Sequence, residues 1–247
     1  MKSVLISIQP KWCEKITRII GQKGSIPIYR KSEEIRKTKP KLETPFKCHI
    51  YCTSSNVHDC LMVNESGTKR VATINYKTAI PCGGYIGNGK VIGEFVCDCI
   101  ANYEAELWDD ETYERIQEFY EPDDFAEYGE YEYKTIADNG DDFWRDNKLC
   151  QSSCLTIEEL RKYVGAGIAT FYGWHISDLV IYDKPKELSE FYTECKMDCE
   201  HCEMWGYTRV NADEFDMDCK SDWFNHKPLK RPPQSWCYIE HTDEKGR

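Results

Sequence analysis

The sequence lacks any run of 18 consecutive apolar residues, the length that a membrane-spanning helix requires. Its N-terminal apolar run, from Val4 to Ile8, is too short to be the core of a signal peptide. We therefore expect a cytoplasmic protein. Thiols stay reduced in the cytoplasm, so the 14 cysteines are expected to be free or to bind metal.

Three common catalytic motifs are also absent. The sequence contains no Walker loop, no Gly-x-Ser-x-Gly elbow and no dinucleotide-binding fingerprint. None of the chemistries that depend on these motifs is therefore indicated.

An overall excess of positive charge is missing as well, because the net charge is −11. Nonspecific binding to duplex nucleic acid needs a broad basic surface that releases counterions, and this composition argues against one. The charge is unevenly distributed, however. Residues 1–50 contain 12 Lys and Arg against 4 Glu, whereas residues 101–150 contain 4 Lys and Arg against 17 Asp and Glu. A local basic site near the N-terminal end is compatible with this pattern.

Hydrophobic periodicity predicts many short strands and few helices. A helix should begin at Pro10 and end before Gly21, and the Thr156–Glu159 capping box predicts a second helix over 157–164. Strands are expected at 3–8, 33–38, 46–53, 71–76, 91–100, 178–182 and 235–240. This pattern predicts an α+β fold, a small mixed β-barrel with flanking short helices.

The segment 104–146 is both acidic and rich in aromatic residues. The aromatic side chains predict that it docks on the body of the protein and is not a free tail. A solvated acidic face is the simplest interpretation of its charge. The alternative is a surface that mimics nucleic acid or binds a basic protein partner.

A cysteine cluster near the C-terminal end gives the sharpest chemical signal. Its two-residue spacing between Cys199 and Cys202 lets both thiolates face one metal ion, and four sulfur ligands favour tetrahedral zinc. The predicted ligands of a structural zinc are Cys195, Cys199, Cys202 and Cys219, with His226 as an alternative to the last. The competing interpretation is a set of free cysteines on a surface excursion.

Other cysteine and aromatic residues have two interpretations each. Five cysteines are expected to be small core residues: Cys13, Cys48, Cys52, Cys60 and Cys97. Three tryptophans are either core or rim residues, or they stack against a nucleobase: Trp12, Trp174 and Trp236. His175 is expected to be structural.

A charged group lies on the predicted strand at 33–38. Because residues two apart share a face of a strand, Glu34 and Arg36 should project together, with Lys31 close by. A Glu and an Arg side by side could recognise a base edge or a phosphate. The spacing alone favours the simpler interpretation, an ordinary ion pair on a solvated strand face.

Several of these segments together resemble an ASCH domain, a branch of the PUA-like superfamily. The resemblance is carried by SIQPKWCEKI, RKSEEIRKTKPK, TPFKCHIYCT, VIGEFVCDCI, SCLTIEELRKYVG, YGWHISDLVIYDKPKELSEF and RPPQSWCYIE. The family motif is Gly-x-Lys-x-x-Glu-x-Arg, of which Lys31, Glu34 and Arg36 match the last three fixed positions while Tyr29 replaces the glycine. The last four of these segments resemble the larger ASCH-like proteins of Gram-positive bacteria and their phages.

The resemblance implies a PUA-like barrel over residues 1–192, completed by a final strand and tail in 231–247. The acidic insertion at 104–146 and a cysteine-rich, zinc-binding excursion over 193–230 are additions to that barrel. A basic cleft that binds RNA or a modified nucleotide is also implied, with ligand-binding residues Lys31, Glu34, Arg36, Trp12, Trp174 and Trp236.

Catalysis by such a domain is a second implication. Some ASCH proteins remove the acetyl group of acetylcytidine, and others are reported ribonucleases. In the amidohydrolases a lysine acts with a threonine three residues later and with a glutamate from a later strand. Lys31 matches the lysine, Glu34 stands at the threonine position, and Glu94 is a candidate for the later glutamate. A carboxylate beside Lys31 holds it charged, which favours binding over nucleophilic catalysis.

Three functions therefore remain open. The first is a cytoplasmic module that binds RNA or a modified nucleotide in a basic cleft. The second is an amidohydrolase or nuclease that acts on a modified nucleoside or RNA. The third is an interaction protein that uses its acidic region.

Overall fold

The structure is a computed structural model, and it describes the residues 2–18, 21–23, 26–28, 30–55, 59–65, 68–74, 80, 83–107, 114–120, 132–138, 148–165, 167–193 and 228–240. Within them the protein is mostly β, with one six-stranded, one five-stranded and one three-stranded sheet and a two-stranded hairpin. The helices are few and short. No helix in these ranges is long and apolar enough to cross a membrane.

The six-stranded sheet joins the two ends of the chain. Its strands, in spatial order, are β14 (Ser177–Lys186), β9 (Lys90–Cys97), β5 (Phe46–Cys52), β1 (Lys2–Ile8), β16 (Trp236–Glu240) and β15 (Tyr192–Thr193). Strand β1 is parallel to β5 and antiparallel to β16, and the remaining pairs are antiparallel. The N-terminal strand is thus paired on one side with a strand that starts 44 residues later and on the other side with the last described strand.

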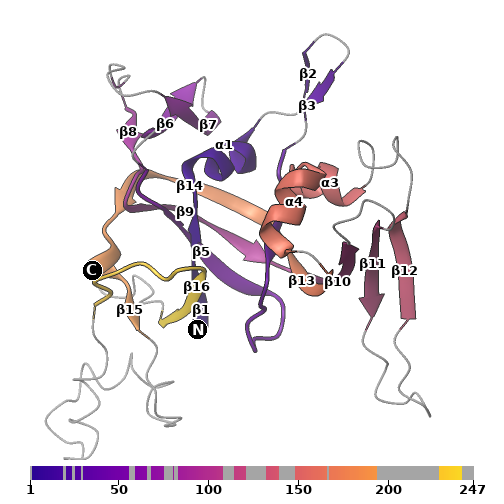
Figure 1. The fold of residues 1–247 in the computed structure, drawn as a ribbon. Helices are drawn as coiled ribbons and strands as arrows, with labels where there is room; N and C mark the ends of the chain where they lie inside the picture. The colour runs from indigo at the N-terminus through magenta and orange to yellow at the C-terminus, as the bar shows by residue number, and fades with distance from the viewer. Residues whose placement is uncertain are drawn as a thin grey trace, which may run out of the picture.

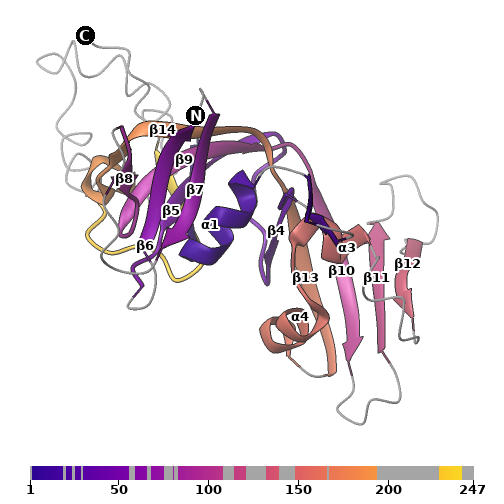
Figure 2. The same ribbon diagram turned by 90° about the horizontal axis from the view of Figure 1, so that it is seen from above.

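The five-stranded sheet is antiparallel throughout. Its order is β12 (Glu132–Asp138), β11 (Glu114–Tyr120), β10 (Ile100–Leu107), β13 (Gly167–His175) and β4 (Glu33–Arg36). Three of these strands come from the acidic segment, so its described part is folded into a sheet, and Ile116 on β11 is fully buried. The two large sheets lie on opposite sides of the molecule in both views (Figure 1, Figure 2).

Two short connections carry the chain from one large sheet to the other. Asp98 and Cys99 link β9 to β10, and Ile176 links β13 to β14. The His175 amide donates a hydrogen bond of 3.1 Å to the carbonyl of Cys99, which holds the two connections together. The expected single strand at 91–100 is therefore wrong, because the chain changes sheets at Asp98 and Cys99.

Smaller elements cover the two large sheets. Helix α1 (Pro10–Thr17) contacts the three-stranded sheet β7 (Thr68–Ile74), β6 (Asp59–Glu65) and β8 (Tyr85–Ile86), and the hairpin follows α1 as β2 (Gly21–Lys23) and β3 (Ile26–Ile28). Near the five-stranded sheet lie α3 (Lys148–Ser153) and α4 (Ile157–Val164), and the short helix η1 (Leu188–Glu190) follows β14.

The largest hydrophobic core lies between the six-stranded sheet, α1 and the β6–β7 strands. It contains Ile6, Ile50, Phe95 and Trp174 together with all five of the cysteines that were expected to be core residues. Each of these cysteines is at most 1 % exposed, which confirms that expectation. A second core joins Ile35 and Phe171 to helices α3 and α4.

The expected helices and most expected strands are present, but the described residues show no closed barrel. Helix α4 begins at the predicted capping box, and α1 begins at Pro10 but ends at Thr17, before Gly21. The described strands of the six-stranded sheet end at β14 and β15, so they do not close into a barrel.

Candidate functional site

Strand β4 is unusual because its polar sequence, Glu-Glu-Ile-Arg, is buried at every position. It forms the edge of the five-stranded sheet, where Glu34 lies opposite Trp174 and Arg36 opposite Tyr172. The interpretation as a solvated strand face is therefore wrong. Pairing with β13 on one side, and α1 and α3 nearby, exclude water from side chains that the sequence alone would leave exposed.

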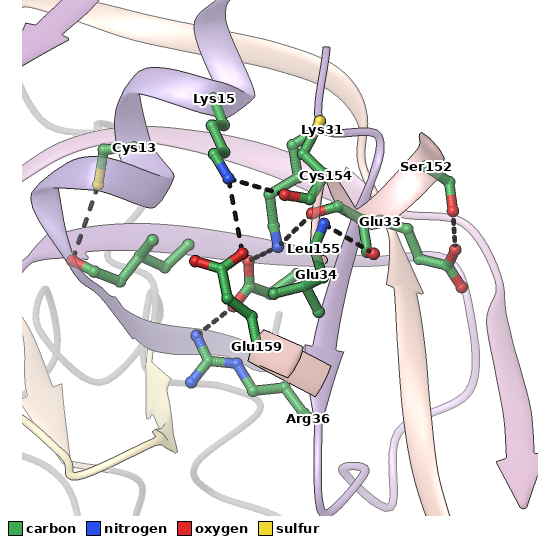
Figure 3. Close-up of polar contacts among 12 residues, drawn as sticks. Cys13, Lys15, Lys31, Glu33, Glu34, Arg36, Ser152, Cys154, Leu155 and Glu159 are labelled. Atoms are coloured by element: carbon green, nitrogen blue, oxygen red, sulfur yellow. Dashed lines mark hydrogen bonds and ion pairs between the residues drawn. The ribbon is translucent and has the colours of Figure 1, made fainter. Parts of the chain in front are cut away.

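Lys31, Glu34 and Arg36 form one ion-paired group, here called the charged cluster (Figure 3). The Lys31 ammonium lies 3.3 Å from one Glu34 carboxylate oxygen, and the Arg36 guanidinium lies 2.9 Å from the other. The three side chains are between 3 and 8 % exposed. The predicted shared face of Glu34 and Arg36 is confirmed, since strand alternation brings them together.

Backbone carbonyls complete the contacts of the two cations. Lys31 donates a hydrogen bond of 3.1 Å to the carbonyl of Ser153, at the end of α3. Arg36 donates one of 2.8 Å to the carbonyl of Ser7 on β1 and one of 3.3 Å to the Ser235 hydroxyl. The charged cluster thus ties the edge of one large sheet to a central strand of the other.

Three ammonium groups surround the ring of Trp12 on helix α1. The Nζ atoms of Lys11, Lys15 and Lys31 lie 4.4, 4.1 and 4.8 Å from the ring centroid, a distance at which a cation is attracted by the π face. Trp12 is half-buried, and Lys11 is the most exposed of the three lysines. We call Lys11, Trp12 and Lys15 the tryptophan–lysine patch.

Helix α4 brings one carboxylate to this patch. Glu159 lies 3.2 Å from the Lys11 ammonium and 3.9 Å from that of Lys15. The capping box fixes its position, because the Glu159 carboxylate accepts a hydrogen bond of 3.2 Å from the Thr156 amide while the Thr156 hydroxyl accepts one from the Glu159 amide. Lys15 also donates a hydrogen bond of 2.7 Å to the Cys154 carbonyl (Figure 3).

The charges of the patch and the charged cluster do not cancel. Four cations, namely Lys11, Lys15, Lys31 and Arg36, face two carboxylates, Glu34 and Glu159, so the six side chains carry +2 at neutral pH. Burial lowers the pKa of Lys15, the charge of Glu159 opposes that effect, and the nearby Arg18 and Lys31 add to it. A region of positive potential is thus concentrated in a chain whose net charge is negative.

Glu33 does not belong to this group, because it lies on the opposite face of β4. It accepts a hydrogen bond of 2.7 Å from the Tyr103 hydroxyl and one of 2.6 Å from the Ser152 hydroxyl. Burial, together with the negative charge of Glu33, raises the pKa of Tyr103. The contacts of Glu33 thus link β4 to β10 and α3, and each of its carboxylate oxygens accepts one hydrogen bond.

Glu94, the predicted partner of Lys31 in catalysis, makes its described contacts elsewhere. Its carboxylate lies 3.0 Å from Lys47, accepts a hydrogen bond of 2.7 Å from Tyr182 and lies 3.5 Å from His49. Burial alone would raise the pKa of Glu94, but the Tyr182 and Lys47 donors and the His49 charge outweigh it, and the pKa is lowered. The structure therefore does not bring Glu94 into the charged cluster.

The other two predicted stacking residues are part of the hydrophobic packing. Trp174 is fully buried, and its ring packs edge-on against Phe46 at a centroid distance of 5.8 Å. Its predicted role in stacking on a ligand is wrong for this structure, because no part of the ring reaches the surface. Trp236 is half-buried, and its ring centroid lies 5.8 Å from that of Trp174. Its indole nitrogen donates a hydrogen bond of 2.9 Å to the Thr38 hydroxyl.

Sequence reasoning missed a group of three core cysteines that come from three different elements. Cys13 on α1, Cys52 at the end of β5 and Cys60 on β6 have sulfur atoms that all lie within 4.8 Å of one another. We call them the thiol triad. Hydrogen bonds from the thiols of Cys13 and Cys60 lower the pKa of Cys52, while burial raises that of Cys13. Such a group could hold a metal ion such as zinc.

A second group of metal-binding residue types lies where the chain changes sheets. Asp98, Cys99 and His175 have donor atoms within 4.8 Å of one another, and all three are partly or fully exposed. The His175 ring nitrogen lies 2.6 Å from the Asp98 carboxylate, and this hydrogen bond lowers the pKa of Asp98. That hydrogen bond ties His175 at the end of β13 to the connection between β9 and β10.

The predicted zinc ligands Cys195, Cys199, Cys202 and Cys219, and the alternative His226, all lie outside the described residues. Comparison of the chain with protein-family models, with curated proteins and with solved structures finds no match. The function must therefore be argued from the described side chains themselves.

Proposed function

We propose that this chain is a PUA-like module that binds RNA or a modified nucleotide through the tryptophan–lysine patch, which lies next to the charged cluster. The single observation that carries the proposal is the arrangement of three lysine ammonium groups 4.1 to 4.8 Å from the centroid of one half-buried indole ring. The resemblance of the sequence around Lys31, Glu34 and Arg36 to the ASCH motif supports the same assignment.

The electrostatics favour an anionic ligand. Gathering Lys11, Lys15 and Lys31 around one ring costs like-charge repulsion, which the two nearby carboxylates offset only in part. A phosphate group placed beside Lys11 and Lys15 would reduce the remaining repulsion and accept hydrogen bonds from these two ammonium groups. Bonds between charged donors and a phosphate are stronger than neutral ones.

The indole ring supports a nucleotide over a simple anion. Single-stranded nucleic acids are recognised by combining a basic surface with an aromatic side chain on which a base stacks. The patch supplies both within two turns of one helix, at Lys11, Trp12 and Lys15. The acidic remainder of the chain would repel a long duplex and would so favour short or single-stranded ligands.

The contacts of Lys31 favour binding over catalysis. A nucleophilic lysine needs a free amine, whereas Lys31 is ion-paired with the Glu34 carboxylate 3.3 Å away and donates a hydrogen bond to the Ser153 carbonyl. The glutamate expected to assist the amidohydrolase reaction, Glu94, makes its described contacts with Lys47, Tyr182 and His49. We therefore assign the charged cluster to supporting the patch and positioning its positive charge.

Titration of the protein with cytidine 5′-monophosphate, acetylcytidine 5′-monophosphate and a short single-stranded RNA tests the proposal. Lys15→Ala should weaken binding by about 10- to 150-fold, since a hydrogen bond to a charged group contributes about 1.5–3 kcal/mol. Trp12→Leu should remove stacking and weaken binding by about 5- to 150-fold, corresponding to about 1–3 kcal/mol per base.

The matched control is Lys90→Ala, which removes an equally cationic side chain that pairs with Glu187 away from the patch. Its affinity should equal that of the wild type. Equal affinity in the wild type, Lys15→Ala and Trp12→Leu would refute the proposed site. Deacetylated product that disappears in Lys31→Ala would instead establish the enzyme.

A further inference from the structure

The thiol triad differs from the other buried cysteines because its three sulfur atoms lie close to one another. Cys48 and Cys97 lie in the same core and are equally buried, yet neither belongs to the group of sulfur atoms within 4.8 Å of one another. Cys13, Cys52 and Cys60 reach that group from a helix, a strand end and a separate sheet. Core packing alone requires burial of each thiol, but it does not require the three sulfur atoms to meet.

The spacing of the sulfur atoms fits a single metal ion. When three atoms lie within 4.8 Å of one another, one point lies within about 2.8 Å of all of them, close to a zinc–sulfur bond of about 2.3 Å. A shift of about half an ångström by each side chain would complete the coordination. Thiolate ligands select zinc over the hard cations magnesium and calcium.

The backbone around two of the ligands is held in place by the turn before β9. The Gly89 amide donates a hydrogen bond of 2.8 Å to the Cys52 carbonyl, and the Gly87 amide donates one of 2.7 Å to the Cys60 carbonyl. Asn88 accepts a bond of 2.5 Å from the Cys60 amide. A Cβ atom at Gly87 would come within 2.7 Å of Ile92 and 3.6 Å of the Cys60 sulfur, so glycine permits this close approach.

We propose that Cys13, Cys52 and Cys60 bind one zinc ion through their thiolates, as a structural site that joins the three-stranded sheet to α1 and the six-stranded sheet. Binding displaces the thiol protons to solvent. Three thiolates without a cation would bury three negative charges, whereas zinc reduces that charge to −1. The ion leaves one tetrahedral position for a further donor.

The site would strengthen the packing of α1 against the three-stranded sheet. The Val71 amide on β7 donates a hydrogen bond of 2.8 Å to the Thr17 hydroxyl on α1, and that hydroxyl in turn faces the Val71 carbonyl at 3.4 Å. A zinc ion bound by Cys13 and Cys60 would add a further link one turn earlier on the same face of the helix. This proposal does not depend on the proposed nucleotide binding.

Zinc content per chain tests the site in full-length protein purified without chelator. Because zinc is also predicted at Cys195–Cys219, the measurement uses a background that carries Cys199→Ser and Cys202→Ser. We expect one zinc per chain in that background. Adding Cys52→Ser or Cys60→Ser should remove it, whereas the matched control Cys48→Ser, in the same core, should retain it.

Alkylation of the native wild-type chain, followed by mass spectrometry, keeps the proposal falsifiable if those variants do not fold. A strong chelator should increase alkylation of Cys13, Cys52 and Cys60 and leave Cys48 and Cys97 unchanged. The proposal is overturned by a zinc-free background protein, by zinc that persists after Cys52→Ser, or by alkylation that the chelator does not change. A disulfide within the triad would likewise overturn it.

Discussion

The charged cluster and the thiol triad lie near the same short helix, α1, but their polar groups are buried in different surroundings. Lys31 and Arg36 both pair with Glu34, and the two cations also donate hydrogen bonds to backbone or hydroxyl oxygens. Cys13, Cys52 and Cys60 are packed among apolar residues, where neutral thiols cost little. The first group contains its own ion-pair partners, while the second would become charged only with an added ion.

This difference indicates which of the two groups could bind a ligand directly. The charged cluster is internally paired and buried, so a ligand of the proposed site would meet Lys11 and Lys15 beside it and not the cluster itself. Each thiol can lose its proton to a metal ion that replaces its charge, so the triad can take its ligand into the core. A binding surface and a structural metal site can therefore adjoin the same helix without competing for side chains.

The largest effect is expected from removing the centre of the charged cluster. Glu34→Leu leaves Lys31 and Arg36 as buried cations without their shared carboxylate, and loss of one partner of a buried pair costs about 3–5 kcal/mol. Urea denaturation measures this change as a fall in the free energy of unfolding.

The matched control replaces all three charges together, as Lys31→Met, Glu34→Leu and Arg36→Met. An apolar replacement of a whole ion-paired group is often neutral, so this triple variant should be more stable than Glu34→Leu alone. Unchanged stability of the Glu34→Leu protein would contradict the contrast with the thiol triad. It would show that burial of Lys31 and Arg36 does not depend on their ion pairs with Glu34.

A smaller fall in the free energy of unfolding is expected from loss of the N-cap of α4, the helix that carries the Glu159 carboxylate to the patch. Thr156→Ala removes the hydroxyl that accepts the hydrogen bond of the Glu159 amide, and loss of an N-cap of this kind costs about 1 kcal/mol. The free energy of unfolding in urea should fall by that amount. Thr156→Ser keeps the hydroxyl and should match the wild type; equal losses in both variants would show that the cap is not responsible.

The smallest effect is expected at Glu94, a carboxylate that water reaches. Its pKa is lowered in the folded state, so its ionised form stabilises the fold at pH values above the unfolded pKa of about 4.5. This contribution is lost as the pH falls through the lower, folded pKa. The free energy of unfolding of Glu94→Gln, measured from pH 6 to pH 2, should therefore fall less steeply than that of the wild type.

Tyr182→Phe removes one of the hydrogen-bond donors to Glu94 and should give an intermediate pH dependence. Identical pH profiles for all three proteins would contradict the stabilisation of the ionised Glu94. They would also remove the contrast between a carboxylate partly in water and the fully buried Glu34.

Local patterns in the sequence predicted the features that depend on neighbours along the chain. Helix α4 begins at the Thr156 capping box, and strand alternation correctly placed Glu34 and Arg36 on one face. The apolar content of residues 3–8 and 46–53 predicted strands there, and the structure has β1 and β5 at these positions. These predictions succeeded because capping and alternation involve residues only two or three positions apart.

Only the tertiary structure decided which of those features become buried or meet. Pairing with β13 buried the charged strand β4, whose sequence is that of an exposed edge, and the change of sheets at Asp98 divided one apolar run into two strands. Cys13 and Cys52 are 39 residues apart, and each is typical of an isolated core cysteine. Their sulfur atoms meet because α1 packs beside the end of β5 and against β6, and a contact over such a separation leaves no periodic signal in the sequence.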